Sequence, residues 1–172
     1  MSKGGDYGGG TRSIREFLDG KRFGVAGVSR RGDVAANAVF KNLRGCGFET
    51  FPINPNADEV EGETCYPDVA SVPGVLDGVV IGTHPSVART VVEQCAEAGV
   101  RRVWCHRAFG EGSVSPDAVD ACNRHGIEYV VGGCPLMFCE PVDFGHKYAP
   151  TSFKDSQRET RVQIRPARRA RW

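Results

Sequence analysis

The sequence lacks long apolar runs, and none approaches the ~20 residues that a membrane-spanning helix needs. Its first eleven residues also lack the apolar core of a secretory signal peptide. The net charge is only +1 over 172 residues, with 25% of the residues charged and 40% hydrophobic. These features exclude a membrane-spanning protein and a strongly basic or acidic domain, and they predict a cytoplasmic protein with one hydrophobic core.

Metal-binding cysteine motifs are missing as well. No two cysteines have the C-x-x-C spacing of a zinc knuckle, and the seven cysteines are scattered through apparent strands and helices. In a cytoplasmic protein this usage is typical of free thiols that pack in the core. We therefore predict no metal site and no catalytic residue, with a nucleophilic pair of Cys105 or Cys134 and His106 as the less favoured alternative.

The third absence concerns nucleotide binding. The segment from Phe23 to Val28 is typical of a buried parallel strand, and it runs into a turn with glycines at positions 24, 27 and 32 before a predicted helix. Such a turn brings backbone N–H groups and the positive end of a helix close to a phosphate. The Gly-x-Gly-x-x-Gly fingerprint of dinucleotide sites is missing, however. The acidic residue that usually ends the second strand of an NAD site is missing too, because Asn54 and Pro55 stand there. Without that acid, an anionic or phosphorylated ribose would be better tolerated.

Strands and helices alternate five times with short connections, which predicts an α/β protein with a parallel sheet covered on both faces. We expect a Rossmann-like three-layer fold with a five-stranded sheet in the order 3-2-1-4-5. Any ligand should then lie at the carboxyl edge of the sheet. The segment from Gly62 to Pro67 is expected to be a loop. The expected strands are 23–28, 48–53, 77–82, 101–105 and 127–131.

The two ends of the chain differ from this domain, which is expected to cover residues 12–147. Residues 1–11 are glycine-rich and are predicted to form a flexible tail, and residues 148–172 form a basic tail. From Thr151 to Trp172 seven basic residues stand against two acidic ones, so the rest of the chain carries a charge of −4. A nucleic-acid-associated protein acting through this arginine-rich tail is one functional alternative, and its binding would weaken steeply with salt.

Four short motifs occur in a definite order: GVAGVS from Gly24, PINPN from Pro52, EG from Glu61 followed by CYPD, and GGCP from Gly132. Together they resemble the CoA-binding domain family. This is the Rossmann-like domain also found at the start of the succinyl-CoA synthetase alpha subunit and of ADP-forming acyl-CoA synthetases. The resemblance covers roughly residues 13–144 and leaves out both tails.

The resemblance implies that CoA lies across the carboxyl edge of the sheet. Its phosphates would lie at the turn after the first strand, its adenine end near the end of the second strand, and its pantetheine arm along the start of the helix after the third. The absence of an acidic residue after the second strand also suits CoA, because the CoA ribose carries a 3′-phosphate that such an acid would repel. The residues expected to contact CoA are Gly27, Val28, Ser29, Arg30, Arg31, Pro52, Asn54, Pro55, Thr83, His84, Pro85, Val87 and Cys134.

Some of these side chains have an equally simple structural role. His84 is well placed to cap a helix, and Arg30 and Arg31 are typical of solvated surface charges. Cys134 either packs in the core or presents a reactive thiol that forms a mixed disulfide with CoA.

The function we expect is that of a small stand-alone protein that binds CoA or acyl-CoA without catalysis of its own. The 172 residues leave no room for the further domains of the large synthetases. The enzyme alternatives are an NAD(P)-dependent oxidoreductase and a CoA-ligase partner subunit whose catalytic half is on another chain. A homo-oligomer or a complex with a partner enzyme is compatible with these interpretations, and a membrane partner is not expected.

Overall fold

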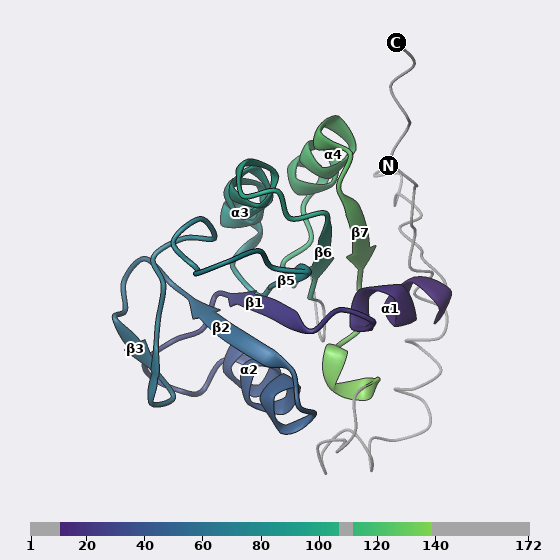
Figure 1. Cartoon of the computed structure of the whole chain (residues 1–172). Coiled ribbons are helices and arrows are strands. Elements are labelled where there is room, and N and C mark those ends of the chain that lie inside the picture. Colours follow the sequence, from purple (N-terminus) through teal and green to yellow (C-terminus); the bar gives the residue numbers. More distant parts are fainter. Residues whose placement is uncertain (1–10, 107–111, 139–172) are drawn as a thin grey trace.

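The computed structural model describes residues 11–106 and 112–138, where a five-stranded parallel sheet lies between two layers of helices (Figure 1). This architecture confirms the predicted Rossmann-like α/β fold. Apart from Thr11, both predicted tails lie outside the described residues. The elements are α1 (Thr11–Leu18), β1 (Arg22–Ala26), α2 (Ala35–Gly45), β2 (Glu49–Ile53), β3 (Glu59–Val60), β4 (Glu63–Thr64), β5 (Gly78–Ile81), α3 (Pro85–Glu97), β6 (Arg102–Cys105), α4 (Pro116–His125), β7 (Glu128–Val131) and the 3-10 helix η1 (Pro135–Met137).

The strand order is a correction to the prediction. The sheet runs β2-β1-β5-β6-β7, which is 2-1-3-4-5 in the order of the five predicted strands, so the expected 3-2-1-4-5 is wrong. The physical reason is burial. Every residue of β5 is buried, as an interior strand requires, whereas β2 carries the exposed Glu49. Pro52, which has no N–H for a second neighbouring strand, also suits the edge position of β2.

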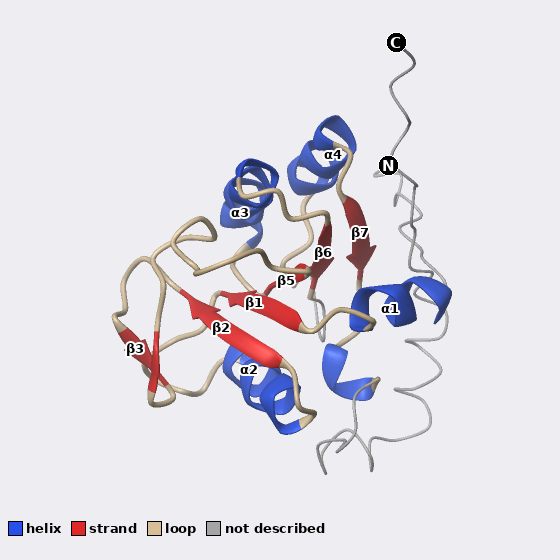
Figure 2. Cartoon of the chain, viewed as in Figure 1, coloured by secondary structure: helices blue, strands red, loops and turns tan. Residues whose placement is uncertain are grey.

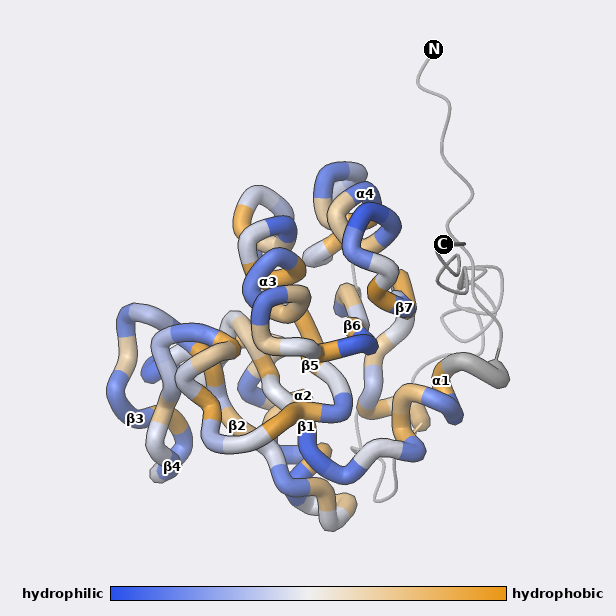
Figure 3. Tube along the Cα trace, turned by 45° about the horizontal axis from the view of Figure 1, so that its top comes forward, coloured by the Kyte–Doolittle hydropathy of each residue, from blue (hydrophilic) through white to orange (hydrophobic). Residues whose placement is uncertain are grey.

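Helices cover both faces of the sheet (Figure 2). A hydrophobic cluster is buried on each face. On one face, α3 and α4 pack their apolar sides inward, and both helices alternate between hydrophilic and hydrophobic positions in Figure 3. On the other face, the Phe17 ring of α1 stacks on Phe23 and meets Trp104 edge-on, with ring centroids 5.0 and 5.5 Å apart. None of the helices in the described ranges is long and apolar enough to cross a membrane.

The connection between β2 and β5 contains a hairpin where a loop was expected. β3 and β4 pair antiparallel, with Glu61 and Gly62 in the turn, both at positive φ. The chain then runs along the outer edge of β2, where the Tyr66 N–H donates to Pro52 O and the Tyr66 carbonyl accepts from Asn54 N, each at 2.9 Å. The hairpin thus lies next to the carboxyl end of β2 (Figure 1).

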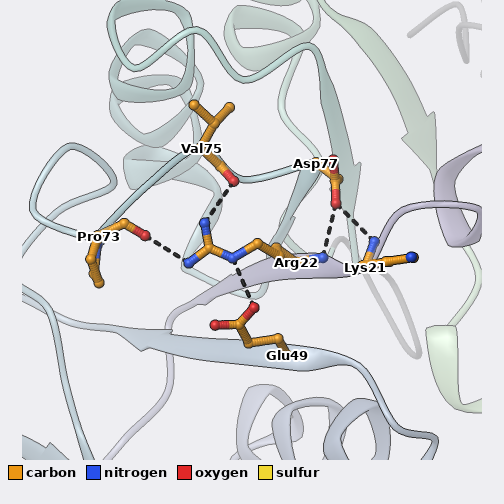
Figure 4. A network of polar contacts seen from close by, with 6 residues as sticks. All are labelled: Lys21, Arg22, Glu49, Pro73, Val75 and Asp77. Carbon is orange, nitrogen blue, oxygen red and sulfur yellow. Dashed lines mark hydrogen bonds and ion pairs between the residues drawn. The ribbon is translucent and has the colours of Figure 1, made fainter.

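A polar network at the opposite, amino edge of the sheet holds the loop before β5 (Figure 4). Arg22 donates through Nε to Glu49 at 2.9 Å and through its Nη atoms to the carbonyls of Pro73 and Val75, at 2.7 and 3.1 Å. The Asp77 carboxylate accepts the backbone N–H groups of Arg22 and the residue before it, at 2.9 and 2.8 Å, and these bonds lower the pKa of that carboxyl. The network therefore helps to keep β5 beside β1.

Candidate functional site

The helical connections reverse direction between β1 and β5. From β1 the chain passes through α2 to the edge strand β2, whereas from β5 it passes through α3 and α4 to β6 and β7 on the other side. Ligands of open α/β sheets bind outside the carboxyl ends of the strands at such a reversal. Two segments meet there: the β1 turn, residues 27–34, and the β5 turn, residues 82–84.

The two turns touch at Gly27. This residue has φ +94°, and a Cβ built on it would lie 2.6 Å from the carbonyl of Gly82 and 2.7 Å from the nitrogen of Thr83. Gly82 is also close to α2, because its own Cβ would lie 2.9 Å from that of Ala36. A glycine is therefore needed at position 27 because the two turns pack closely together, whether or not a phosphate binds there.

A buried amide in the first turn of α2 orders the β1 turn. The Oδ1 atom of Asn37 accepts the Ser29 N–H at 2.7 Å, and its Nδ2 donates to Ser29 O and to the Glu61 carboxylate, both at 2.8 Å. The Asn37 side chain is completely buried. Asn37 was not among the predicted site residues, although an asparagine among the apolar positions of a predicted helix was a usable signal.

Two side chains expected to contact a ligand are already bound to backbone. The Ser29 hydroxyl accepts the Arg31 N–H at 3.2 Å. The Asn54 Nδ2 donates to Val28 O at 2.6 Å, and its Oδ1 accepts the Asn56 N–H at 2.8 Å. Asn54 therefore ties the end of β2 to the β1 turn. The Val28 side chain is fully buried, which leaves only its backbone near the edge.

The two arginines of the β1 turn are exposed. Arg31 lies 3.5 Å from Asp33, but 82% of its side chain and 61% of that of Asp33 remain accessible, so solvent screens this pair. Arg30 is exposed as well, so both arginines are accessible to an anion from solvent. Of the two prolines expected nearby, Pro55 is exposed, whereas Pro52 is buried within β2 opposite Val25.

The β5 turn contains a buried hydroxyl. The Oγ1 atom of Thr83 is shielded from solvent and makes no hydrogen bond with any residue that the structure describes. Its carbonyl accepts the Ser113 hydroxyl at 2.6 Å, which links the β5 turn to the segment after β6. An unmade hydrogen bond costs about 1–3 kcal/mol, so a ligand group that reached this hydroxyl would gain from it.

The start of α3 is capped as the sequence indicated. His84 is the N-cap residue, and its Nδ1 accepts the Ser86 N–H at 3.3 Å. Pro85 follows as the first helical residue, where its missing N–H costs nothing. Val87 in the same turn is 45% exposed, and Val34, the N-cap residue of α2, is 37% exposed. Both helices at the reversal therefore present an apolar side chain.

The ends of β6 and β7 are buried. Burial raises the pKa of the Cys105 thiol to about 12, so it is protonated and a poor nucleophile at neutral pH. Cys134 is only 2% exposed and packs in the cluster on the α2 side of the sheet. The alternative of a nucleophilic pair with His106 is therefore disfavoured for both cysteines.

The family model of the CoA binding domain matches residues 21–140. This chain belongs to the CoA-binding domain family. The match includes all five strands and the β1 and β5 turns, and it confirms the resemblance seen in the sequence motifs.

The relatives of this protein differ greatly in length. This chain is 32% identical over 123 residues to acetate–CoA ligase [ADP-forming] II of Archaeoglobus fulgidus, a match that covers 66% of this chain and 18% of the ligase. It is 26% identical to the alpha subunit of acetate–CoA ligase [ADP-forming] II of Pyrococcus furiosus, over 69% of this chain and 27% of that subunit. The solved structure of a hypothetical protein from Pyrococcus horikoshii superimposes on this chain with a TM-score of 0.69 at 28% sequence identity. The match covers 78% of this chain and 94% of that protein. The chain therefore spans less than a third of the ligase proteins but most of the smaller relative.

Proposed function

We propose that this protein binds CoA or an acyl-CoA between the β1 turn and the β5 turn, as a binding module without catalysis of its own. The observation that carries the proposal is the contact at Gly27, which brings the β1 turn and the start of α3 together at the reversal of the sheet. Family membership supports CoA as the ligand.

The start of α2 is suited to the CoA phosphates. Val34 provides no side-chain cap, and the first turn of α2 contains no acidic residue. By contrast, α4 has a Ser115 cap and Asp117 in its first turn. An uncapped N-terminus leaves backbone N–H groups and a partial positive charge for an anion. Arg30 and Arg31 would add charge-assisted hydrogen bonds to phosphate.

The pantetheine arm would continue along the β5 turn. Val34 and Val87 offer apolar contacts on the two helices. The Thr83 hydroxyl offers a hydrogen bond to an amide of the arm. When bound, CoA would supply a thiol or thioester, and the chain would hold and orient it.

A second candidate is a CoA-ligase partner subunit. The similarity to the Pyrococcus furiosus alpha subunit favours it, since that protein is one subunit of a larger enzyme. Both candidates use the same CoA site, and co-purification of a catalytic partner would distinguish them. The nucleic-acid alternative depends on the tail at 148–172, which lies outside the described residues.

CoA is expected to raise the melting temperature more than NAD at equal concentration. At a hundred times the Kd a ligand stabilises the folded state by about 2.7 kcal/mol, or roughly 5–10 °C for a domain of this size. Differential scanning fluorimetry measures the shift. Arg30→Ala/Arg31→Ala should weaken CoA binding by about tenfold. Arg124→Ala, an exposed arginine at the end of α4, should leave it unchanged. A larger shift with NAD than with CoA would disprove the CoA assignment.

Cys134 is expected to stay unmodified when the folded protein is incubated with CoA disulfide. A mixed disulfide needs an accessible thiolate, and this side chain is 2% exposed. Peptide mass spectrometry would locate any adduct, with the unfolded protein as the positive control. An adduct on Cys134 of the folded protein would show that the turn after β7 opens and that the thiol contacts the coenzyme.

A further inference from the structure

Glu61 has an unusual backbone conformation. It lies in the turn between β3 and β4 with φ +52°, and among residues 11–106 and 112–138 it alone of the non-glycine residues has a positive φ. This region is strained for a residue with a side chain. Such strain persists only where the surrounding structure enforces it, and it gathers at functional sites.

The Glu61 side chain reaches the β1 turn. Its Oε1 accepts from Asn37 Nδ2 at 2.8 Å and lies 3.4 Å from Lys41 Nζ. The same oxygen would be 3.5 Å from a Cβ on Gly32. The hydrogen bond from Asn37, together with Lys41, lowers the pKa of the Glu61 carboxyl, so it is ionised at neutral pH.

The ionised Glu61 carboxylate and the Ser29 carbonyl together fix which way the Asn37 amide points, because both accept from its Nδ2. An amide has a donor end and an acceptor end of nearly equal size, and a carboxylate accepts only from the donor end. With Nδ2 facing Glu61, Oδ1 faces the Ser29 N–H, as observed at 2.7 Å. The orientation of one buried amide thus links the hairpin to the β1 turn.

We propose that Glu61 is a positioning residue, which holds the Asn37 amide so that the Ser29–Gly32 part of the β1 turn is ordered before a ligand arrives. It acts through Asn37 and need not contact the ligand. The inference rests on the proposed function for the identity of the ligand, CoA, but not for the ordering of the turn.

Three variants of Glu61 separate the role of the carboxylate from that of the backbone. Glu61→Ala removes the acceptor, and Glu61→Gly removes it while relieving the positive φ. Glu61→Gln keeps an oxygen that can accept from Asn37. The matched control is Glu63→Ala in the same hairpin, because Glu63 pairs with Arg44 of α2 at 2.6 Å rather than with Asn37.

Two measurements are made on each protein: hydrogen exchange of the Ser29 amide by NMR without ligand, and the Kd for CoA. In Glu61→Ala and Glu61→Gly we expect Ser29 to exchange about tenfold faster or more, and CoA to bind about tenfold more weakly. Glu61→Gly should melt no lower than Glu61→Ala, since its turn is unstrained. Glu61→Gln should stay within about threefold of wild type in both measurements.

The outcomes distinguish the two proposals. Wild-type Ser29 exchange in Glu61→Ala, or equal acceleration in Glu63→Ala, would overturn the positioning role. If Ser29 exchange responds to Glu61→Ala but the wild-type protein does not bind CoA, the proposed function fails and the positioning role stands.

Discussion

Replacing Gly27 with alanine is expected to lower the free energy of unfolding by roughly 2–5 kcal/mol, the sum of an overpacked contact and a strained φ. A methyl group at this position would meet backbone atoms of Gly82 and Thr83 at 2.6–2.7 Å, and backbone cannot move aside as a flexible side chain can. The φ of +94° adds strain for any residue with a side chain. Urea denaturation followed by fluorescence or circular dichroism measures the change through the midpoint and slope.

Two other glycines separate these causes. Gly47 has φ +89° but open space around it, so Gly47→Ala should cost only the backbone strain, about 1–2 kcal/mol. Gly45, the last residue of α2, has no positive φ and nothing within 4 Å, so Gly45→Ala should be neutral or stabilising by up to about 1 kcal/mol. If Gly27→Ala proved as stable as Gly47→Ala, the two turns would not touch as described.

The fold class was predictable from sequence because it depends on local patterns. Short buried strands alternate with helices whose apolar residues recur at helical spacing, and this alternation is enough to predict a parallel sheet. The strand order was not predicted correctly, because it depends on which strand tolerates an edge. Glu49 and Pro52 in β2 indicated the edge, and the apolar Val79, Val80 and Ile81 in β5 indicated the interior.

The carboxyl edge was chosen for the candidate site by a general rule for such sheets, and it stays a prediction. The hydrogen bonds of the side chains at that edge could not be predicted. Ser29 and Asn54 have the polar groups of ligand contacts, yet they bind backbone in neighbouring turns. The bond between Asn37 and Glu61 joins residues 24 positions apart through a hairpin that no periodic pattern indicates. Such contacts depend on how loops fold over one another.

Replacing Asn54 with aspartate tests whether an acid after the second strand would create an NAD site. We expect it to destabilise the protein by about 2–3 kcal/mol at pH 7, without a gain in NAD affinity. The Asn54 Nδ2 donates to Val28 O at 2.6 Å, and an ionised carboxylate there cannot donate and would face a carbonyl oxygen. The side chain is therefore turned toward the β1 turn rather than toward a ribose. Asn56→Asp, at an exposed position two residues on, is the control and should change stability by less than about 0.5 kcal/mol.

The loss of folding stability caused by Asn54→Asp should become smaller as the pH falls. A carboxylate held against the Val28 carbonyl has a folded-state pKa above the ~3.9 of an unfolded aspartate, because only the protonated acid can donate the missing hydrogen bond. The hydrogen bond from the protonated acid to Val28 O is therefore fully present below the pKa of the acid in the unfolded chain. It is lost as the pH rises through the pKa of the acid in the folded protein. Urea denaturation between pH 4 and pH 8 measures the difference from wild type. A loss that stays constant with pH, or an NAD-dependent rise in melting temperature in Asn54→Asp alone, would show that this side chain faces outward and would favour the oxidoreductase alternative.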